Sequence, residues 1–135
     1  MIRQLDDRTM VSGQVAPHEV AGLAEQGVTM LVNNRPDGEE DGQPFASEIE
    51  DVAAQVGIGY RFVPIIRGIG PADIEEMQKA LREVGDGKLL AFCRSGTRSA
   101  YAVGLAKREE GASADEVSNC LVSAGFDPGP IAHLL

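Results

Sequence analysis

The chain has 135 residues, a length typical of one domain with its own apolar core, here residues 1–135. Hydrophobic residues make up 43% and charged residues 24%, as in ordinary globular proteins. The net charge of −9 argues against binding to nucleic acid or to an anionic membrane, because both partners select basic surfaces. No apolar run approaches the roughly 18–20 residues of a membrane span. The first residues lack the apolar segment of a secretory signal, so we expect a cytoplasmic protein.

Segments with strand and helix patterns alternate from the beginning of the chain. Residues 8–13 predict a short strand, and residues 17–26 predict a helix with a proline at its start. Residues 28–33 are almost entirely apolar and predict a buried strand. Residues 34–44 are rich in Gly, Pro and acidic side chains and predict a loop. Apolar side chains then recur at helical spacing through residues 45–56.

The same alternation continues to the end of the chain. Residues 60–66 predict a strand, and residues 71–85 predict an amphipathic helix. Residues 88–93 are apolar at nearly every position, which is typical of a parallel strand covered on both faces. Two helices are predicted after it, a buried one to residue 107 and an amphipathic one around residues 117–124. The order predicts an α/β fold with a mostly parallel sheet of four or five strands flanked by helices.

The most informative stretch lies between the last strand and the buried helix. It reads Phe-Cys-Arg-Ser-Gly-Thr-Arg-Ser and places Cys93 at the end of the strand. Successive amides of such a loop can surround an anion, and the helix that begins near Arg98 adds its positive end. Both effects favour a thiolate, so we predict that Cys93 is a catalytic nucleophile. We predict that Arg98 helps to hold the group that Cys93 carries during the reaction. We expect the substrate to contact Arg94, Ser95, Gly96, Thr97 and Ser99.

Cysteines can also be structural, and two alternatives follow from that. Cys93 could be a core cysteine at a strand end, since free cysteine is often buried. Cys120 could act as a resolving thiol, but its place on an apolar helix face favours core packing. The two histidines, His18 and His133, lie near opposite ends of the chain. We therefore expect neither a metal site nor a cofactor.

Arginines follow three of the predicted strands. Arg35 follows the second, Arg67 follows the next, and Arg94 follows the last. Ligands of open parallel sheets bind at the carboxyl ends of the strands. These arginines therefore predict a positively charged funnel for a small anionic or persulfide substrate. The oligomeric state is left open by the sequence. The alternative is that Arg35 and Arg67 are solvated or pair with Asp37, Glu39 or Glu40.

Three stretches resemble a known family. Residues 33–40, 60–65 and 92–100 are similar to the bacterial beta-lactamase-hydrolase-like, phosphatase-like domains, and the resemblance spans roughly residues 5–127. The family implies a fold similar to that of dual-specificity phosphatases, with the nucleophile loop after a central strand. Members are also described as sulfurtransferases, so the resemblance implies two chemistries.

Spacing and acid residues distinguish these chemistries. Cysteine phosphatases carry Cys-x5-Arg, which would require arginine at the position of Ser99. Arg98 instead gives Cys-x4-Arg, which resembles the loop of single-domain rhodaneses. Phosphatases also use an aspartate as general acid, and only Asp37 or Asp73 could serve.

Sulfur transfer needs no acid, so the main prediction is a sulfurtransferase that forms a persulfide on Cys93 from thiosulfate or a persulfide donor and passes the sulfur to a thiol acceptor. The alternatives are a phosphatase of low efficiency acting through a phosphocysteine, and a non-catalytic anion-binding or redox-sensing module.

Overall fold

Five strands form one sheet, and the strand that precedes Cys93 lies at its centre. The computed structural model describes residues 1–135, and the strand order is β1-β2-β5-β3-β4. The strands are β1 (Ile2–Asp6), β2 (Thr9–Ser12), β3 (Val28–Asn33), β4 (Gly59–Phe62) and β5 (Lys88–Phe92). Only β1 runs antiparallel to its neighbour. The mostly parallel sheet predicted from the sequence is confirmed.

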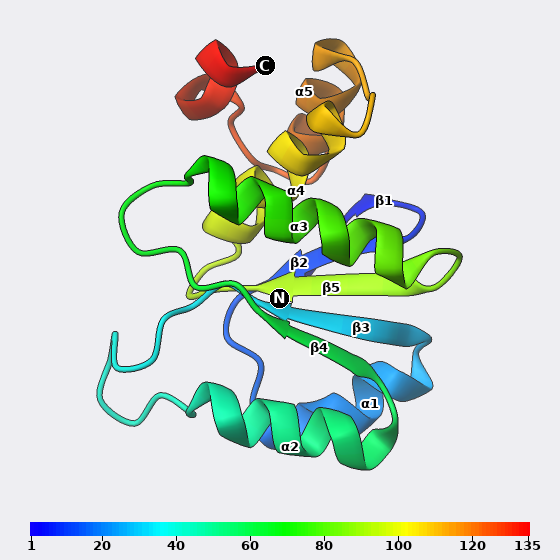
Figure 1. Ribbon diagram of the computed structural model, residues 1–135, viewed down its shortest axis with the longest axis vertical. Helices are drawn as coiled ribbons and strands as arrows, with labels where there is room; N and C mark the ends of the chain where they lie inside the picture. Colours follow the sequence, from blue (N-terminus) through cyan, green and yellow to red (C-terminus); the bar gives the residue numbers. More distant parts are fainter.

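Helices cover both faces of the sheet, as Figure 1 shows. The helices are α1 (Val20–Glu25), α2 (Ala46–Val56), α3 (Pro71–Val84), α4 (Thr97–Glu109) and α5 (Ala114–Ser123), with short 3-10 helices at Pro17–Glu19 and Gly129–Leu134. Helices α1 and α2 pack on one face over a cluster of 9 buried apolar residues. Helices α3, α4 and α5 lie on the other side, over a cluster of 19. No helix is both long and apolar enough to cross a membrane.

Two elements differ from the sequence prediction. The strand β1 was not predicted, because its first three residues are exposed and show no apolar alternation. The strand β4 ends at Phe62, earlier than the predicted end at residue 66. Pro64 explains the early end, since proline has no N–H to donate to a neighbouring strand.

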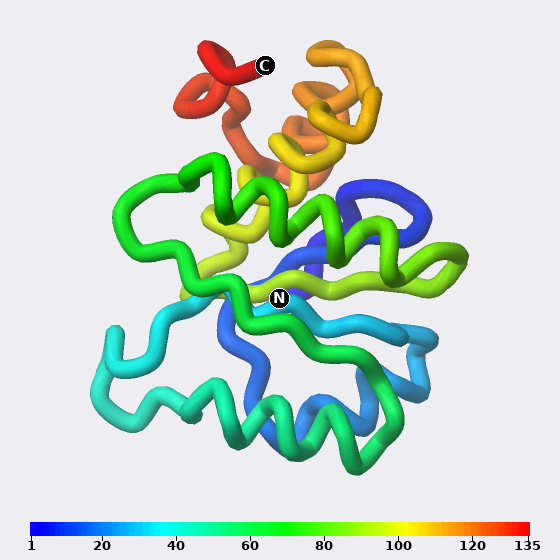
Figure 2. The backbone as a smooth tube through the Cα atoms, in the orientation of Figure 1, coloured from blue at the N-terminus to red at the C-terminus, as the bar shows by residue number.

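The carboxyl ends of the parallel strands meet at one edge of the sheet. The connection from β5 to α4 leaves this edge, and so does the long loop between β3 and α2 (Figure 2). Backbone hydrogen bonds join these exits directly, since the amide of Asn34 donates to the carbonyl of Phe92 at 2.8 Å. The fold therefore places the 34–44 loop next to Cys93.

Candidate active site around Cys93

Cys93 lies directly after the central strand and is fully buried. Its sulfur accepts a hydrogen bond from the amide of Gly96 at 3.1 Å. Gly96 has φ 97° and is the N-cap of α4, a left-handed conformation that glycine adopts without steric penalty. The turn thus aims an amide and the amino end of α4 at the sulfur. Both stabilise a negative charge there.

Arg98 is the second residue of α4, and its guanidinium is held along one edge. Nη1 donates to the carbonyl of Ile65 at 2.9 Å and to Glu39 Oε2 at 2.7 Å, while Nη2 donates to Glu39 Oε1 at 2.8 Å. These bonds use three of the five N–H groups. The remaining two, on Nε and Nη2, share the opposite edge of the planar group. That edge can make a two-point contact with an oxyanion.

Glu39 binds two arginines of the site. Besides Arg98, its Oε1 accepts from Nε of Arg35 at 2.9 Å. The hydrogen bond from Arg98 lowers the pKa of Glu39 to about 2, with a further contribution from Arg35. The same bond raises the pKa of Arg98, and the neighbouring Cys93 adds to this shift. At neutral pH the cluster therefore holds a carboxylate between two guanidinium groups.

Arg35 is 3% exposed, unlike a solvated loop residue. Its Nη1 donates to Oε1 of Gln14 at 3.0 Å, and its Nη2 is buried without a partner. For this arginine the alternative of an internal ion pair holds, with Glu39 as the partner. No pattern in the sequence indicated Gln14, which lies on the segment after β2.

The other loop residues are more open to solvent. Arg94 is exposed and pairs with Glu40 at 3.0 Å. Arg67 is exposed and follows the exit of β4. Ser95 is exposed and donates to Oγ1 of Thr97 at 3.3 Å. Of these side chains, only Arg94 is held by an ion pair, and this pair comes again from the 34–44 loop.

Ser99 occupies a different environment from the other predicted substrate contacts. It is fully buried, and its hydroxyl donates to Oδ1 of Asn34 at 2.8 Å. Asn34 in turn donates to the carbonyl of Val63 at 3.0 Å. This buried chain of bonds joins the exits of β3 and β4 to α4. Ser99 therefore supports the loop from below and offers no surface to a substrate.

The two predicted acids are both helix-capping groups. Oδ1 of Asp37 accepts from the amide of Ala46 at 2.8 Å, at the start of α2. Oδ2 of Asp73 accepts from the amide of Gly70 at 2.9 Å, at the start of α3. Such bonds satisfy amides that a helix leaves unpaired at its amino end. Neither carboxylate makes a hydrogen bond to a residue of the Cys93 loop.

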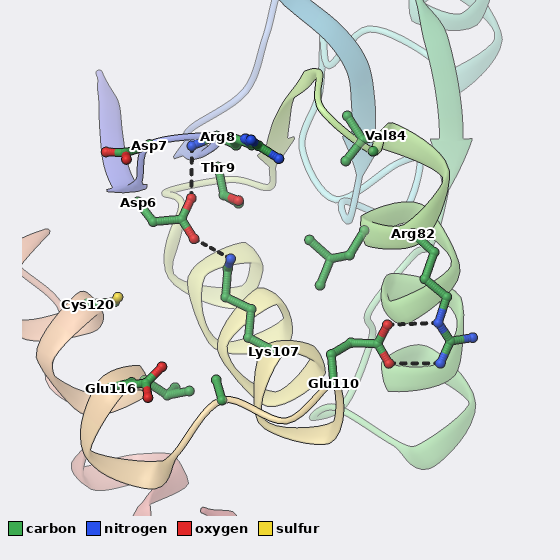
Figure 3. Close-up of a pocket in the computed structure, with 14 residues that line it drawn as sticks. Asp6, Asp7, Arg8, Thr9, Arg82, Val84, Lys107, Glu110, Glu116 and Cys120 are labelled. Carbon is green, nitrogen blue, oxygen red and sulfur yellow. Dashed lines mark hydrogen bonds and ion pairs between the residues drawn. The ribbon is translucent and has the colours of Figure 1, made fainter.

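Cys120 lies far from this site. It lines a cleft of about 740 Å³ together with Thr9 and Gly85, which lie just before or at the amino ends of β2 and β5. Figure 3 shows Cys120 near the ion pair of Asp6 and Lys107. Strand β5 has 5 residues and spans about 16 Å at roughly 3.3 Å per residue. A disulfide requires the two Cα atoms to lie within about 7 Å, so the fold does not support Cys120 as a resolving thiol.

Comparison with known families agrees with this architecture. The model of a family described as beta-lactamase hydrolase-like protein, phosphatase-like domain, matches residues 1–110. The chain belongs to this family. A beta-lactamase hydrolase-like protein of Xylella fastidiosa strain Temecula1 is 35% identical over 130 residues. A protein of the same name from Agrobacterium fabrum is 34% identical over 97 residues, or 71% of this chain.

The curated relatives are much longer than this chain. The match covers 95% of the chain but 30% of the Xylella protein, and 22% of the Agrobacterium protein. The family resemblance inferred from three stretches of the sequence is therefore confirmed for the phosphatase-like part of these proteins.

Solved structures share the fold over nearly the whole chain. A proposed phosphatase of Neisseria meningitidis Z2491 is 29% identical with a TM-score of 0.77, covering 98% of this chain and 94% of that one. Tk-PTP in its active form is 19% identical with a TM-score of 0.73, covering 98% and 90%. Kinase-associated phosphatase is 16% identical with a TM-score of 0.71, covering 92% and 82%. The predicted similarity to dual-specificity phosphatases is thus confirmed at the level of the fold.

Proposed function

We propose that this chain is a cysteine-dependent enzyme that hydrolyses phosphoric monoesters through a phosphocysteine on Cys93. The observation that carries the proposal is the loop after β5, where an amide contacts the Cys93 sulfur and Arg98 keeps one edge of its guanidinium free. The family description and the phosphatase-named neighbours support the same chemistry. The sequence alone favoured sulfur transfer. The family description and the phosphatase-named neighbours favour phosphate-ester hydrolysis, which is therefore the first candidate.

The reaction follows from the loop in two displacements. The Cys93 thiolate attacks phosphorus, and the ester oxygen leaves with the bonding electrons and takes a proton from solvent. Loop amides and the free edge of Arg98 stabilise the negative charge on the phosphoryl oxygens. Water then attacks phosphorus, the S–P bond breaks, and inorganic phosphate departs as the thiolate is restored.

The aspartates add an expectation about substrates. Because Asp37 and Asp73 both accept helix amides, no aspartate is held for proton donation to the leaving oxygen. A general acid contributes typically about 10²–10⁴-fold in rate. We therefore expect turnover of aryl phosphates, whose phenolate leaves without a proton, and slow turnover of alkyl phosphates.

Sulfur transfer is the second candidate, favoured by the Cys-x4-Arg spacing. Here the Cys93 thiolate attacks the outer sulfur of thiosulfate, the S–S bond breaks, and sulfite leaves. An acceptor thiolate then takes the outer sulfur from the Cys93 persulfide and restores the thiolate. Sulfite leaves readily without a proton donor, so this route fits a site whose aspartates are committed to capping.

One pair of assays separates the candidates. Purified protein is tested for hydrolysis of p-nitrophenyl phosphate and for thiosulfate-to-thiol sulfur transfer, with Cys93→Ser as the inactive variant and Cys120→Ser as the matched control. The proposal predicts phosphate release and a phosphoryl adduct on Cys93 in trapped protein. Sulfur transfer with a persulfide adduct, and no phosphate release, would replace the first candidate by the second. Loss of neither activity in Cys93→Ser, or absence of both, would refute an enzymatic role for this cysteine.

A further inference from the structure

The tip of the 34–44 loop has the construction of a hinged flap. Gly38 and Gly42 have φ 78° and 81°, and a Cβ at either position would meet no atom within 4 Å. The base of the loop is fixed, since Gln43 Nε2 donates to the carbonyl of Pro36 at 2.8 Å. Residues 38–42 therefore lie between two glycine joints, in open surroundings, above a tied base. We refer to residues 38–42 as the acidic flap.

Side chains of the acidic flap hold the flap to the site through ion pairs. Glu39 contacts Arg98 and Arg35, and Glu40 contacts Arg94. Three of the four arginines expected to bind an anion are thus already paired with carboxylates. In this conformation the charges of Arg35, Arg94 and Arg98 are neutralised, whereas Arg67 forms no ion pair.

The surroundings of Glu39 are those of an oxyanion site. Two guanidinium groups converge on one carboxylate, with N–O distances of 2.7, 2.8 and 2.9 Å. Arg35 is almost wholly buried, and its Nη2 has no partner. An unpaired buried donor is unfavourable, and a ligand with more oxygens than a carboxylate can satisfy it. A sulfonate or phosphoryl group has three free oxygens.

Access to the nucleophile also requires movement. Cys93 is 0% exposed, yet its sulfur has to touch the substrate. The flap is paired with Arg98, whose pKa is raised further by the neighbouring Cys93. Its contact with Arg94 is exposed to solvent. Exposed ion pairs contribute about 0–1 kcal/mol and weaken with salt. Release of Glu40 from Arg94 is therefore a small energetic step. Release of Glu39 costs more, because Arg35 is almost wholly buried, so an incoming anion has to replace the carboxylate.

We infer that Arg35 and the Nη1–Nη2 edge of Arg98 form an oxyanion subsite beside the free Nε–Nη2 edge. Glu39 occupies this subsite in the resting protein, and a tetrahedral oxyanion that binds across both edges displaces the carboxylate as the acidic flap swings away. The inference rests on the proposed function for its substrate class, the sulfonate or phosphoryl end of the donor. Glu40 acts alongside Glu39 by releasing Arg94 when the flap moves. The Glu39 carboxylate is thus an internal anion that competes with the ligand for Arg35 and Arg98.

Anion binding without turnover tests the inference. Titration calorimetry at low ionic strength is done in a Cys93→Ser background, so that no group transfer can occur. It measures the dissociation constants of inorganic phosphate and thiosulfate for this parent and for its Glu39→Gln, Glu40→Gln and Asp41→Asn variants. Each variant removes one negative charge from the flap, but Asp41 forms no ion pair, so Asp41→Asn is the matched control. We expect Glu39→Gln to tighten binding about 3–10-fold and Glu40→Gln about 2–5-fold, and the control to change it less than twofold.

Two results of the binding experiment would overturn the inference. If Glu39→Gln weakens anion binding, the carboxylate positions Arg98 for the ligand and the inference is overturned. Equal tightening by all three variants would attribute the effect to net charge alone and would also overturn it. Since binding is measured without catalysis, failure of the phosphatase proposal leaves this readout intact.

Displacement of the flap has its own signal. The chain contains no tryptophan, so Asp41→Trp places a single indole at the exposed flap tip. We expect its emission to shift on saturation with thiosulfate or phosphate, and the shift to be absent in the Asp41→Trp, Arg98→Ala double variant. Binding without any emission change would refute displacement.

Discussion

Ser99 provides a direct test of why the loop has Cys-x4-Arg spacing. Its hydroxyl is fully buried and donates to Oδ1 of Asn34 at 2.8 Å. Ser99→Ala removes the donor and leaves a buried amide oxygen without a partner, which destabilises a protein by about 1–3 kcal/mol. For a domain of this size the melting temperature should fall by about 3–12 °C.

Calorimetric melting and urea unfolding measure the change, with Ser95→Ala as the matched control. Ser95 is exposed, so its hydroxyl is replaced by water and the control should change stability by less than about 0.5 kcal/mol. Ser99→Arg, which restores the phosphatase spacing, should be more damaging, because a buried cation would have no carboxylate beside it. A Ser99→Ala variant as stable as the control would refute the role assigned to this hydroxyl. A Ser99→Arg variant that folds as stably as the wild type would refute the claim that this buried position cannot hold an arginine.

Three further predictions concern titration and backbone strain. The pKa of Glu39 is lowered to about 2 in the fold, so its contribution to stability is complete above its ordinary value near 4.5 and is lost as pH falls towards 2. Glu39→Gln should therefore lower the free energy of unfolding measured in urea at pH 7, by about 1 kcal/mol or less given the partial exposure, and the difference should nearly vanish near pH 2. An equal loss at both pH values would contradict this. Burial raises the pKa of Tyr60 and of Tyr101, so the midpoint of tyrosinate formation should lie above pH 10, and Tyr60→Phe should halve the absorbance change; a midpoint below pH 10 for either phenol would be the contrary result. Gly96→Ala forces a side chain into φ 97° and should destabilise the fold by about 1–2 kcal/mol while slowing alkylation of Cys93 in a Cys120→Ser background; an unchanged alkylation rate would show that the Gly96 amide does not assist the sulfur.

The elements with strong local patterns were predicted well from the sequence. Strand β5 and helix α3 lie within a residue of their predicted ends, because continuous burial and a regular apolar stripe leave clear patterns. Strand β1 lies at the sheet edge, with three exposed residues in a row. A half-solvated edge strand imposes little apolar pattern, so nothing in its sequence marks it.

Within the site, the backbone was more predictable than the side-chain contacts. The position of Cys93 between a buried strand and a helix largely determines the conformation of the loop. The amide of Gly96 donates to the Cys93 sulfur, as expected for this arrangement. The pairing of Glu39 with Arg98 joins residues 59 positions apart. Such a contact depends on how two loops meet in space, and several acidic residues of the same loop were equally eligible. The buried donor at Ser99 is hidden from the sequence for the same reason. Asp73 is different, because an acidic residue in the first turn of the predicted helix is expected there for structural reasons, and its bond to Gly70 is local.

The backbone N–H and C=O of Ile65 link the strand exits in a way that should be visible in hydrogen exchange. Its N–H donates to the carbonyl of Asn34 at 3.0 Å, and its carbonyl accepts from Arg98 at 2.9 Å. The neighbouring Ile66 is 74% exposed and lies outside these bonds. The Ile65 amide should exchange at the slow rate of the sheet, while Ile66 exchanges like an open loop. The boundary between slowly and rapidly exchanging backbone thus falls between two consecutive isoleucines. Because Arg98 donates to the Ile65 carbonyl, a ligand that binds Arg98 should change amide exchange at this boundary.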